Sequence, residues 1–237
     1  GKQLYNSEPQ FRKHMDECAA IVNVFLLSDG NVNNLVGEMQ IPILSSEERA
    51  VPGMGLLSVV FATWSPDNDA DASKKLFTRP ALLQPCIFAI EYSLARTLLD
   101  YGVEPMAMGG HSIGEYVAAT LSGVFSLSVA LELIMLRGLA TERLASKGSM
   151  LSVKMSDREL TDLLKQHDGA LTVAAANAPL FYVLSGETEA CITAKRWLES
   201  QGKRASLLHV NRAFHSKLMN RASLYLEDFL CRQKLNA

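Results

Sequence analysis

Residues 110–114 read Gly-His-Ser-Ile-Gly and lie between a short apolar run at residues 105–108 and a helical pattern that begins at Ile113. A serine in the pattern Gly-x-Ser-x-Gly between a strand and a helix is typical of a nucleophile turn, which holds the serine strained with its hydroxyl exposed. Glycine is needed beside the serine because a Cβ atom there would collide with the neighbouring strand or helix. The following helix points backbone N–H groups at the same place, where they can stabilise an oxyanion. The sequence therefore predicts a strand at residues 105–108 and a nucleophilic Ser112; a Gly-flanked turn with an incidental serine is the alternative.

A serine nucleophile needs a base, and the chain has five histidines. His14 and His167 lie in polar stretches, where solvated surface histidines are expected. The side chain of His111 should point away from the neighbouring serine, and His209 lies in an apolar strand pattern that favours a structural role. His215 follows the last predicted strand in a loop, where catalytic groups often gather. His215 is therefore the candidate base.

Arg137 lies in the middle of an apolar helical run. Three explanations stay open from the residues alone: the guanidinium reaches water, pairs with an internal carboxylate, or binds an anionic ligand. Gly138 beside it lowers the stability of a helix, which indicates that something approaches the backbone closely there. Glu115 is explained by the dipole of the helix that it opens, and Asn177 by a turn before Ala178-Pro179.

The remaining pattern divides the chain in two. Residues 1–45 are predicted to be mostly helical, residues 45–80 to be rich in loops, and Gln84-Pro85 to open a helix that ends near Asp100. Ser126 is the predicted N-cap of a helix over residues 127–144. From residue 149 the expected order is strand (150–155), helix (156–166), two strands (171–176 and 181–185), helix (187–201) and strand (205–210). This β-α-β-β-α-β order is that of a ferredoxin-like subdomain inserted into an α/β body.

Composition excludes several classes of protein. The 237 residues fit one domain, or one domain with a smaller insert, and 48% of them are hydrophobic, which is not the composition of a disordered chain. The net charge is −2, so the chain lacks the basic surplus that would indicate a nucleic-acid partner or an anionic membrane surface. The four cysteines have no CxxC spacing, and the apolar stretches are too short to span a bilayer. We therefore expect a cytoplasmic protein without a metal site, a disulfide framework or a membrane span.

Several ordered motifs resemble the malonyl-CoA:acyl carrier protein transacylase family, as found in acyltransferase domains of polyketide and fatty-acid synthases. The segments that carry this resemblance are Gln84-Pro85, residues 110–116, Met135-Leu136-Arg137-Gly138, Asn177-Ala178-Pro179, Leu184-Ser185-Gly186 and Ala213-Phe214-His215-Ser216. The resemblance implies an α/β-hydrolase-like body over residues 1–147 and 206–237 with a ferredoxin-like subdomain over residues 148–205.

The same resemblance implies a body that is incomplete at both ends. Sequences of the family carry a Gly-Gln-Gly-Ser-Gln segment on a first strand, which supplies one oxyanion donor, and continue into further core elements after the histidine. This chain begins at Gly1 and ends at Ala237 without them. Loss of one such donor costs about 100- to 1,000-fold in rate, so the chain by itself is expected to be a poor enzyme.

The chemistry that the resemblance implies is a ping-pong transfer. Ser112 would attack the thioester of an acyl-CoA while His215 takes its proton, and the phosphopantetheine thiol of an acyl carrier protein would then take the acyl group. Arg137 would hold the free carboxylate of a malonyl-type unit through a bidentate contact that lysine cannot reproduce. No bound cofactor is implied; coenzyme A is part of the substrate, and neighbouring synthase domains are expected partners.

The resemblance also indicates the choice of acyl unit. Members that select malonyl commonly have a phenylalanine where this chain has Phe214, because a ring leaves less room for a methyl branch, a difference of about 1 to 3 kcal/mol. Ile113 resembles malonyl-type sequences as well, whereas Arg212 stands where histidine is usual. Gln84 is a candidate substrate contact. A serine esterase or thioesterase of related fold and an inactive structural or docking domain stay open as alternatives.

Overall fold

The computed structural model describes residues 1–27, 55–57, 60, 79–233 and 235 of the chain. They form two compact units, one of residues 1–142 with residues 226–237 and one of residues 143–225. The predictions for residues 28–45 and for most of residues 45–80 lie outside the described residues.

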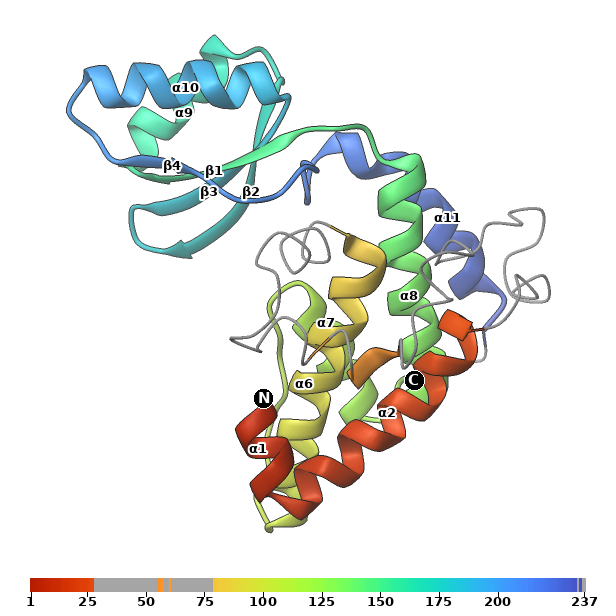
Figure 1. Ribbon diagram of the computed structural model, residues 1–237. Helices are drawn as coiled ribbons and strands as arrows, with labels where there is room; N and C mark the ends of the chain where they lie inside the picture. The colour runs from red at the N-terminus through yellow and green to blue at the C-terminus, as the bar shows by residue number, and fades with distance from the viewer. Residues whose placement is uncertain (28–54, 58–59, 61–78, 234, 236–237) are drawn as a thin grey trace, which may run out of the picture. The chain divides into compact units, whose positions relative to one another are not determined.

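Helices make up the described part of the first unit (Figure 1). The helices with assigned bounds are α1 (Lys2–Ser7), α2 (Pro9–Leu27), α6 (Pro80–Asp100), α7 (Ile113–Leu121), α8 (Leu127–Leu144) and α11 (Asn220–Cys231). The last two residues of α8 and the first six of α11 belong to the second unit. Helix α6 packs against both α2 and α7. The fully buried side chains at the centre of this core include Phe11 and Met15 of α2, Phe88 of α6, and Leu131 and Ile134 of α8. The helical structure predicted for residues 1–45 is therefore confirmed over the described residues 2–27.

Two expectations for this unit are wrong. Helix α6 begins at Pro80, so Pro85 lies inside the helix instead of opening it. Proline is favoured in the first turn of a helix because it loses no hydrogen bond there. In α6 this place is taken by Pro80, five residues before the proline that was predicted to open the helix. Residues 105–108 do not form a strand, and Met106 is fully exposed. A strand exists only as part of a hydrogen-bonded ladder, and no strand in the described part of the chain pairs with these residues.

The second unit is built on an antiparallel sheet. Its elements are β1 (Ser149–Lys154), α9 (Asp157–Gln166), β2 (Leu171–Ala178), β3 (Phe181–Gly186), α10 (Thr188–Ser200) and β4 (Ala205–Leu207). The strands lie in the order β2-β3-β1-β4, and every neighbouring pair is antiparallel. The predicted succession of strands and helices is the observed one. Strand β4 is shorter than predicted. Strand β2 extends through Asn177, and the turn after it consists of Pro179 and Leu180, so the prediction of Asn177 as a turn residue is wrong.

Helices α9 and α10 lie on the same face of this sheet (Figure 1). Leu151 and Val153 of β1 and Leu184 of β3 are buried against Leu163 and Leu198 of the two helices. Alternate residues of a strand share one face, so this side of the sheet forms the core of the unit. The chain thus has an α/β fold of helices with a small antiparallel sheet. In the described residues, no helix is both long and apolar enough to cross a membrane.

Candidate active site

Ser112 has the backbone conformation of a strained turn. It is the N-cap residue of α7, with φ 55° and ψ −107°. This combination lies outside the regions that a residue with a Cβ atom adopts readily, and such strain costs about 1 to 3 kcal/mol. Strained residues of this kind gather at active sites. The structure therefore gives Ser112 the backbone geometry that the sequence pattern predicted.

Gly110 makes this turn possible. A Cβ atom at residue 110 would lie 1.9 Å from the carbonyl carbon of Gly114 and 2.2 Å from the nitrogen of Glu115, so only glycine fits. The side chain of Glu115 also stabilises the turn, because its Oε1 accepts a hydrogen bond from the N–H of Gly110 at 3.2 Å. The helix dipole alone did not indicate this contact. At Gly114 a Cβ atom would meet only Glu91 Oε2, at 3.7 Å, so the steric requirement predicted for both glycines is met at Gly110 and not at Gly114.

The backbone N–H groups of the turn differ in their acceptors. The N–H of Gly114 donates to the carbonyl of His111 at 3.0 Å, and that of Glu115 donates to the carbonyl of Ser112 at 3.2 Å. The N–H of Ile113 has no acceptor in the described part of the chain. It is the N–H that follows the serine, the position from which a nucleophile turn supplies an oxyanion donor.

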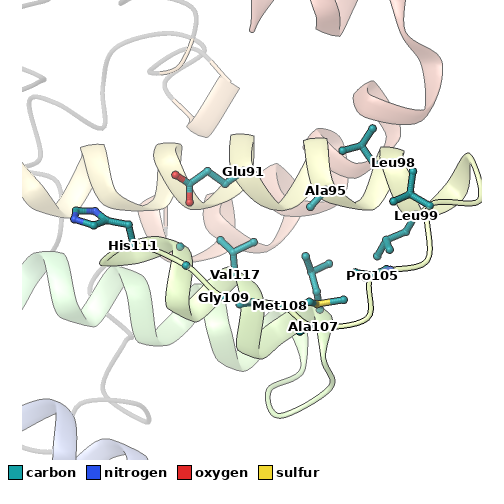
Figure 2. A pocket seen from close by; sticks show the side chains of 15 residues that line it. Glu91, Ala95, Leu98, Leu99, Pro105, Ala107, Met108, Gly109, His111 and Val117 are labelled. Carbon is teal, nitrogen blue, oxygen red and sulfur yellow. The ribbon is translucent and has the colours of Figure 1, made fainter. Parts of the chain in front are cut away.

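A cavity of about 540 Å³ lies beside the turn, between α6, α7 and residues 103–111 (Figure 2). Most of its lining is apolar, and Glu91 and His111 contribute its charged and titratable side chains. Burial raises the pKa of Glu91, and the nearby His111 lowers it to a smaller extent. Ser112 does not line this cavity, so the side chains of His111 and Ser112 have different surroundings.

Arg137 packs against the helix that follows Ser112. Its guanidinium carbon lies 5.8 Å from the centre of the Tyr116 ring, which is cation–π distance. Burial lowers the pKa of Arg137, and Tyr116 partly offsets this by a hydrogen bond and by its charge. Tyr116 is four residues after Ser112, one turn further along α7. Sequence reasoning missed this partner, although the tyrosine belongs to the same motif as the serine.

Gly138 confirms the expected close approach to the backbone. A Cβ atom at this residue would lie 2.5 Å from the carbonyl oxygen of Pro80 and 2.6 Å from Cα of Ala81. Gln84, on the next turn of α6, is buried, and its side-chain Oε1 has no hydrogen-bond partner among the described residues. A buried polar atom without a partner is costly to a fold and is often found where a ligand binds.

His215 and Phe214 lie in the second unit. His215 is exposed and has φ 59°, in the left-handed region. Its loop is held on both sides, because Ser216 Oγ donates to the carbonyl of Ala213 at 2.7 Å and accepts from the N–H of Leu218 at 3.3 Å. Phe214 is half-buried. Among the described residues, the non-glycine residues with positive φ are Ser112, Asp168, Leu180 and His215, so the two predicted catalytic residues share this uncommon backbone state.

The predicted site residues thus fall into two groups. Ser112, Ile113, Arg137 and Gln84 belong to the first unit, where α6, α7 and α8 carry them. His215 and Phe214 belong to the second unit. Within the first unit, the structure connects Arg137 to the helix of Ser112 through Tyr116.

Two of the other histidines differ from expectation. His14 is buried, and its Nε2 lies 2.6 Å from Oδ2 of Asp100, so it joins α2 to α6 instead of facing solvent. The polar residues around it in the sequence are exposed or half-buried, which concealed this role. His209 lies beyond the end of β4 and is exposed, because the strand ends at Leu207.

Comparison with known proteins gives the family. A family model described as acyl transferase domain matches residues 1–233. Polyketide synthase GfsB of Streptomyces halstedii is 40% identical over 142 residues, which are 60% of this chain and 2% of that protein. Erythronolide synthase EryA3 of Saccharopolyspora erythraea is 37% identical over 180 residues, 69% of this chain and 6% of that protein. The chain spans only a small part of the length of these relatives.

Solved structures agree. The acyltransferase domain from the second module of the salinomycin polyketide synthase has a TM-score of 0.72 and 30% identity, over all of this chain and 47% of that chain. Malonyl CoA-acyl carrier protein transacylase from Clostridium perfringens has a TM-score of 0.72 over all of this chain and 64% of that chain; at 20% identity this likeness concerns the fold. The chain therefore belongs to the acyl transferase domain family, of the type found in polyketide synthases and malonyl-CoA:acyl carrier protein transacylases.

Proposed function

We propose that this chain moves a malonyl-type acyl group from coenzyme A to Ser112 and then to the phosphopantetheine thiol of an acyl carrier protein. The observation that carries the proposal is the geometry of α7. Its N-cap serine has a strained backbone, and one turn later its Tyr116 supports the guanidinium of Arg137. A nucleophile at the start of a short helix, with a cation from α8 packed against the same helix, suits an acyl thioester that ends in a carboxylate.

In the first half-reaction, Ser112 Oγ attacks the thioester carbonyl as His215 takes the hydroxyl proton. The N–H of Ile113 stabilises the negative charge on the carbonyl oxygen. The C–S bond then breaks, and the coenzyme A thiolate leaves with the proton from His215. In the second half-reaction, His215 takes the proton of the carrier thiol and the thiol sulfur attacks the carbonyl of the acyl-serine. The C–O bond of the serine ester then breaks, and Ser112 Oγ takes the proton from His215 as it leaves.

Arg137 selects the substrate in this proposal. A half-buried guanidinium that packs against a ring can present its planar set of donors to a carboxylate. The contact also holds the acyl-serine in one orientation, which favours transfer to a thiol over reaction with water. Phe214 favours malonyl over branched units. Gln84 is the further candidate contact, because its buried oxygen has no partner within the part of the chain that the structure describes.

The proposed architecture is an α/β-hydrolase-like body, residues 1–147 and 206–237, with a ferredoxin-like insert at residues 148–205. The strand order β2-β3-β1-β4 and the succession of helices and strands support the insert. The names of the relatives, which are polyketide synthases, support a carrier protein and neighbouring synthase domains as partners.

The test is to incubate the full-length protein with malonyl-CoA and to weigh the intact protein. We expect a mass increase of one malonyl group. This adduct should be absent in Ser112→Ala and should form much more slowly in His215→Ala. Absence of any adduct on the unsubstituted protein would overturn the proposal. An inactive docking domain predicts, in addition, that a fluorophosphonate probe does not label Ser112.

A serine esterase or thioesterase would use the same nucleophile turn. Arg137→Ala separates the two functions, because an esterase without a need for acids should hydrolyse its substrates unchanged. The acyltransferase should lose malonyl loading and accept acetyl-CoA better. The packing of Arg137 on the helix of Ser112 favours the acyltransferase.

A further inference from the structure

We infer that Glu142 is a positioning residue for Arg137: it fixes helix α8 on the first turn of α6 and thereby determines where the guanidinium lies. The inference rests on the proposed function, because it takes Arg137 as the residue that holds the acyl carboxylate.

The first contact is a cap supplied by another helix. Glu142 Oε1 accepts a hydrogen bond from the N–H of Ala81 at 2.9 Å, and its Oε2 lies 3.4 Å from Nη2 of Arg79. Ala81 is in the first turn of α6, where backbone N–H groups have no partner within their own helix. The positive end of the α6 dipole also favours a carboxylate at this place. The side chain of Glu142 is 15% exposed, so water competes little for it.

The second contact lies one turn earlier on the same face of α8. At Gly138 the backbones of α8 and α6 come so close that a Cβ atom would be 2.5 Å from the carbonyl oxygen of Pro80. Such a contact sets the distance between two helices, but a glycine surface alone offers little resistance to sliding. The directional hydrogen bond from Ala81 to Glu142 sets the position of α8 along its axis.

Arg137 adjoins this contact and faces another helix. It precedes Gly138 by one residue, about 100° around the helix, and its guanidinium packs on Tyr116 of α7. Helix α8 thus contacts α6 through Gly138 and Glu142 and contacts α7 through Arg137. A shift of α8 along α6 therefore moves the guanidinium relative to Ser112, and a misplacement of about 1 Å can cost about 100-fold in rate.

The test compares malonyl-CoA with acetyl-CoA as acyl donors to the full-length protein, with kcat and KM measured for each. For Glu142→Ala we expect the ratio of kcat/KM for malonyl to that for acetyl to fall by about tenfold or more, chiefly through a higher KM for malonyl. Glu142→Gln should keep most of the ratio, because its amide oxygen still accepts from Ala81. Arg79→Gln is the matched control: it removes a partly exposed ion pair, leaves the cap in place and should change the ratio by less than about twofold.

A purely structural role for Glu142 predicts a different result. Loss of folded protein lowers the rate for both donors equally, so an unchanged ratio in Glu142→Ala would overturn the inference. Arg137→Ala distinguishes this failure from failure of the proposed function. If Arg137→Ala leaves the ratio unchanged, the assigned role of Arg137 is wrong; if Arg137→Ala abolishes the preference and Glu142→Ala does not alter it, only the positioning role is wrong.

Discussion

The guanidinium of Arg137 on α8 lies over the ring of Tyr116 on α7, 5.8 Å from its centre, and so connects the proposed carboxylate-binding residue to the helix of the nucleophile. A cation–π contact of this kind contributes about 0.5 to 2 kcal/mol. Tyr116→Leu should therefore lower kcat/KM for malonyl-CoA by about 2- to 30-fold while changing that for acetyl-CoA little. Tyr116→Phe keeps the ring and loses only the hydroxyl, so it should lower kcat/KM for malonyl-CoA less than Tyr116→Leu does. Equal losses for both donors in Tyr116→Leu would show that the contact does not act on the carboxylate.

Gly110 and Gly114 flank Ser112 alike in the sequence but differ in the structure. A Cβ atom at residue 110 would overlap backbone atoms, which cannot move aside as a side chain can. Gly110→Ala should lower the free energy of unfolding by about 1 to 3 kcal/mol or more and slow labelling of Ser112 by a fluorophosphonate. Gly114→Ala is the matched control, because its nearest neighbour is a carboxylate oxygen at ordinary contact distance, and it should be milder in both measurements. Thermal unfolding and probe labelling of the two variants check this difference, and equal effects would contradict it.

Glu159 in the second unit gives a prediction for pH. A hydrogen bond from Lys203, followed by bonds from the backbone and side chain of Ser156, lowers the pKa of Glu159 from 4.5 to about 2. Because the folded pKa lies below the unfolded one, the contribution of this carboxylate to stability is complete above about pH 4.5. It is lost as the pH falls toward about 2.

Carbon-13 NMR of the Glu159 carboxyl should follow this titration directly. Lys203→Gln should raise the pKa of Glu159 toward its ordinary value, and Glu159→Gln should flatten the dependence of stability on pH between about 4.5 and 2. Glu199→Gln, which removes a surface pair with Lys195, serves as the control. A pKa of Glu159 that stays the same in Lys203→Gln would contradict the assigned cause.

The four cysteines should react very differently. Burial raises the pKa of Cys18 and Cys86 to about 12 and that of Cys191 to about 11, so these thiols stay protonated and enclosed at neutral pH. Cys231 is exposed. Alkylation of the native protein with iodoacetamide, followed by peptide mass spectrometry, should label Cys231 first and the other three only after unfolding. Early labelling of Cys18 or Cys86 would contradict the described core.

Sequence reasoning succeeded where local rules decide the outcome. The sequence pattern from residue 149 predicted the order of strands and helices in the second unit, and Gly138 indicated a close approach to the backbone because glycine is costly in a helix. It failed where distant partners decide. Residues 105–108 have strand character but no neighbouring strand in the described chain, and His14 is buried by a pairing with Asp100, which lies 86 residues away. The same limit hid Tyr116 and Glu142, whose roles depend on how helices pack.

The most direct test of the account separates transfer from hydrolysis. Full-length protein loaded with malonyl at Ser112 is freed of malonyl-CoA and mixed with a carrier protein that bears phosphopantetheine. Mass spectrometry then follows both products over time. The account predicts that the malonyl group leaves Ser112 and appears on the carrier, with little free malonate formed, and that Arg137→Ala reduces this yield. Release of the group as free malonate, with the carrier left unloaded, would contradict it.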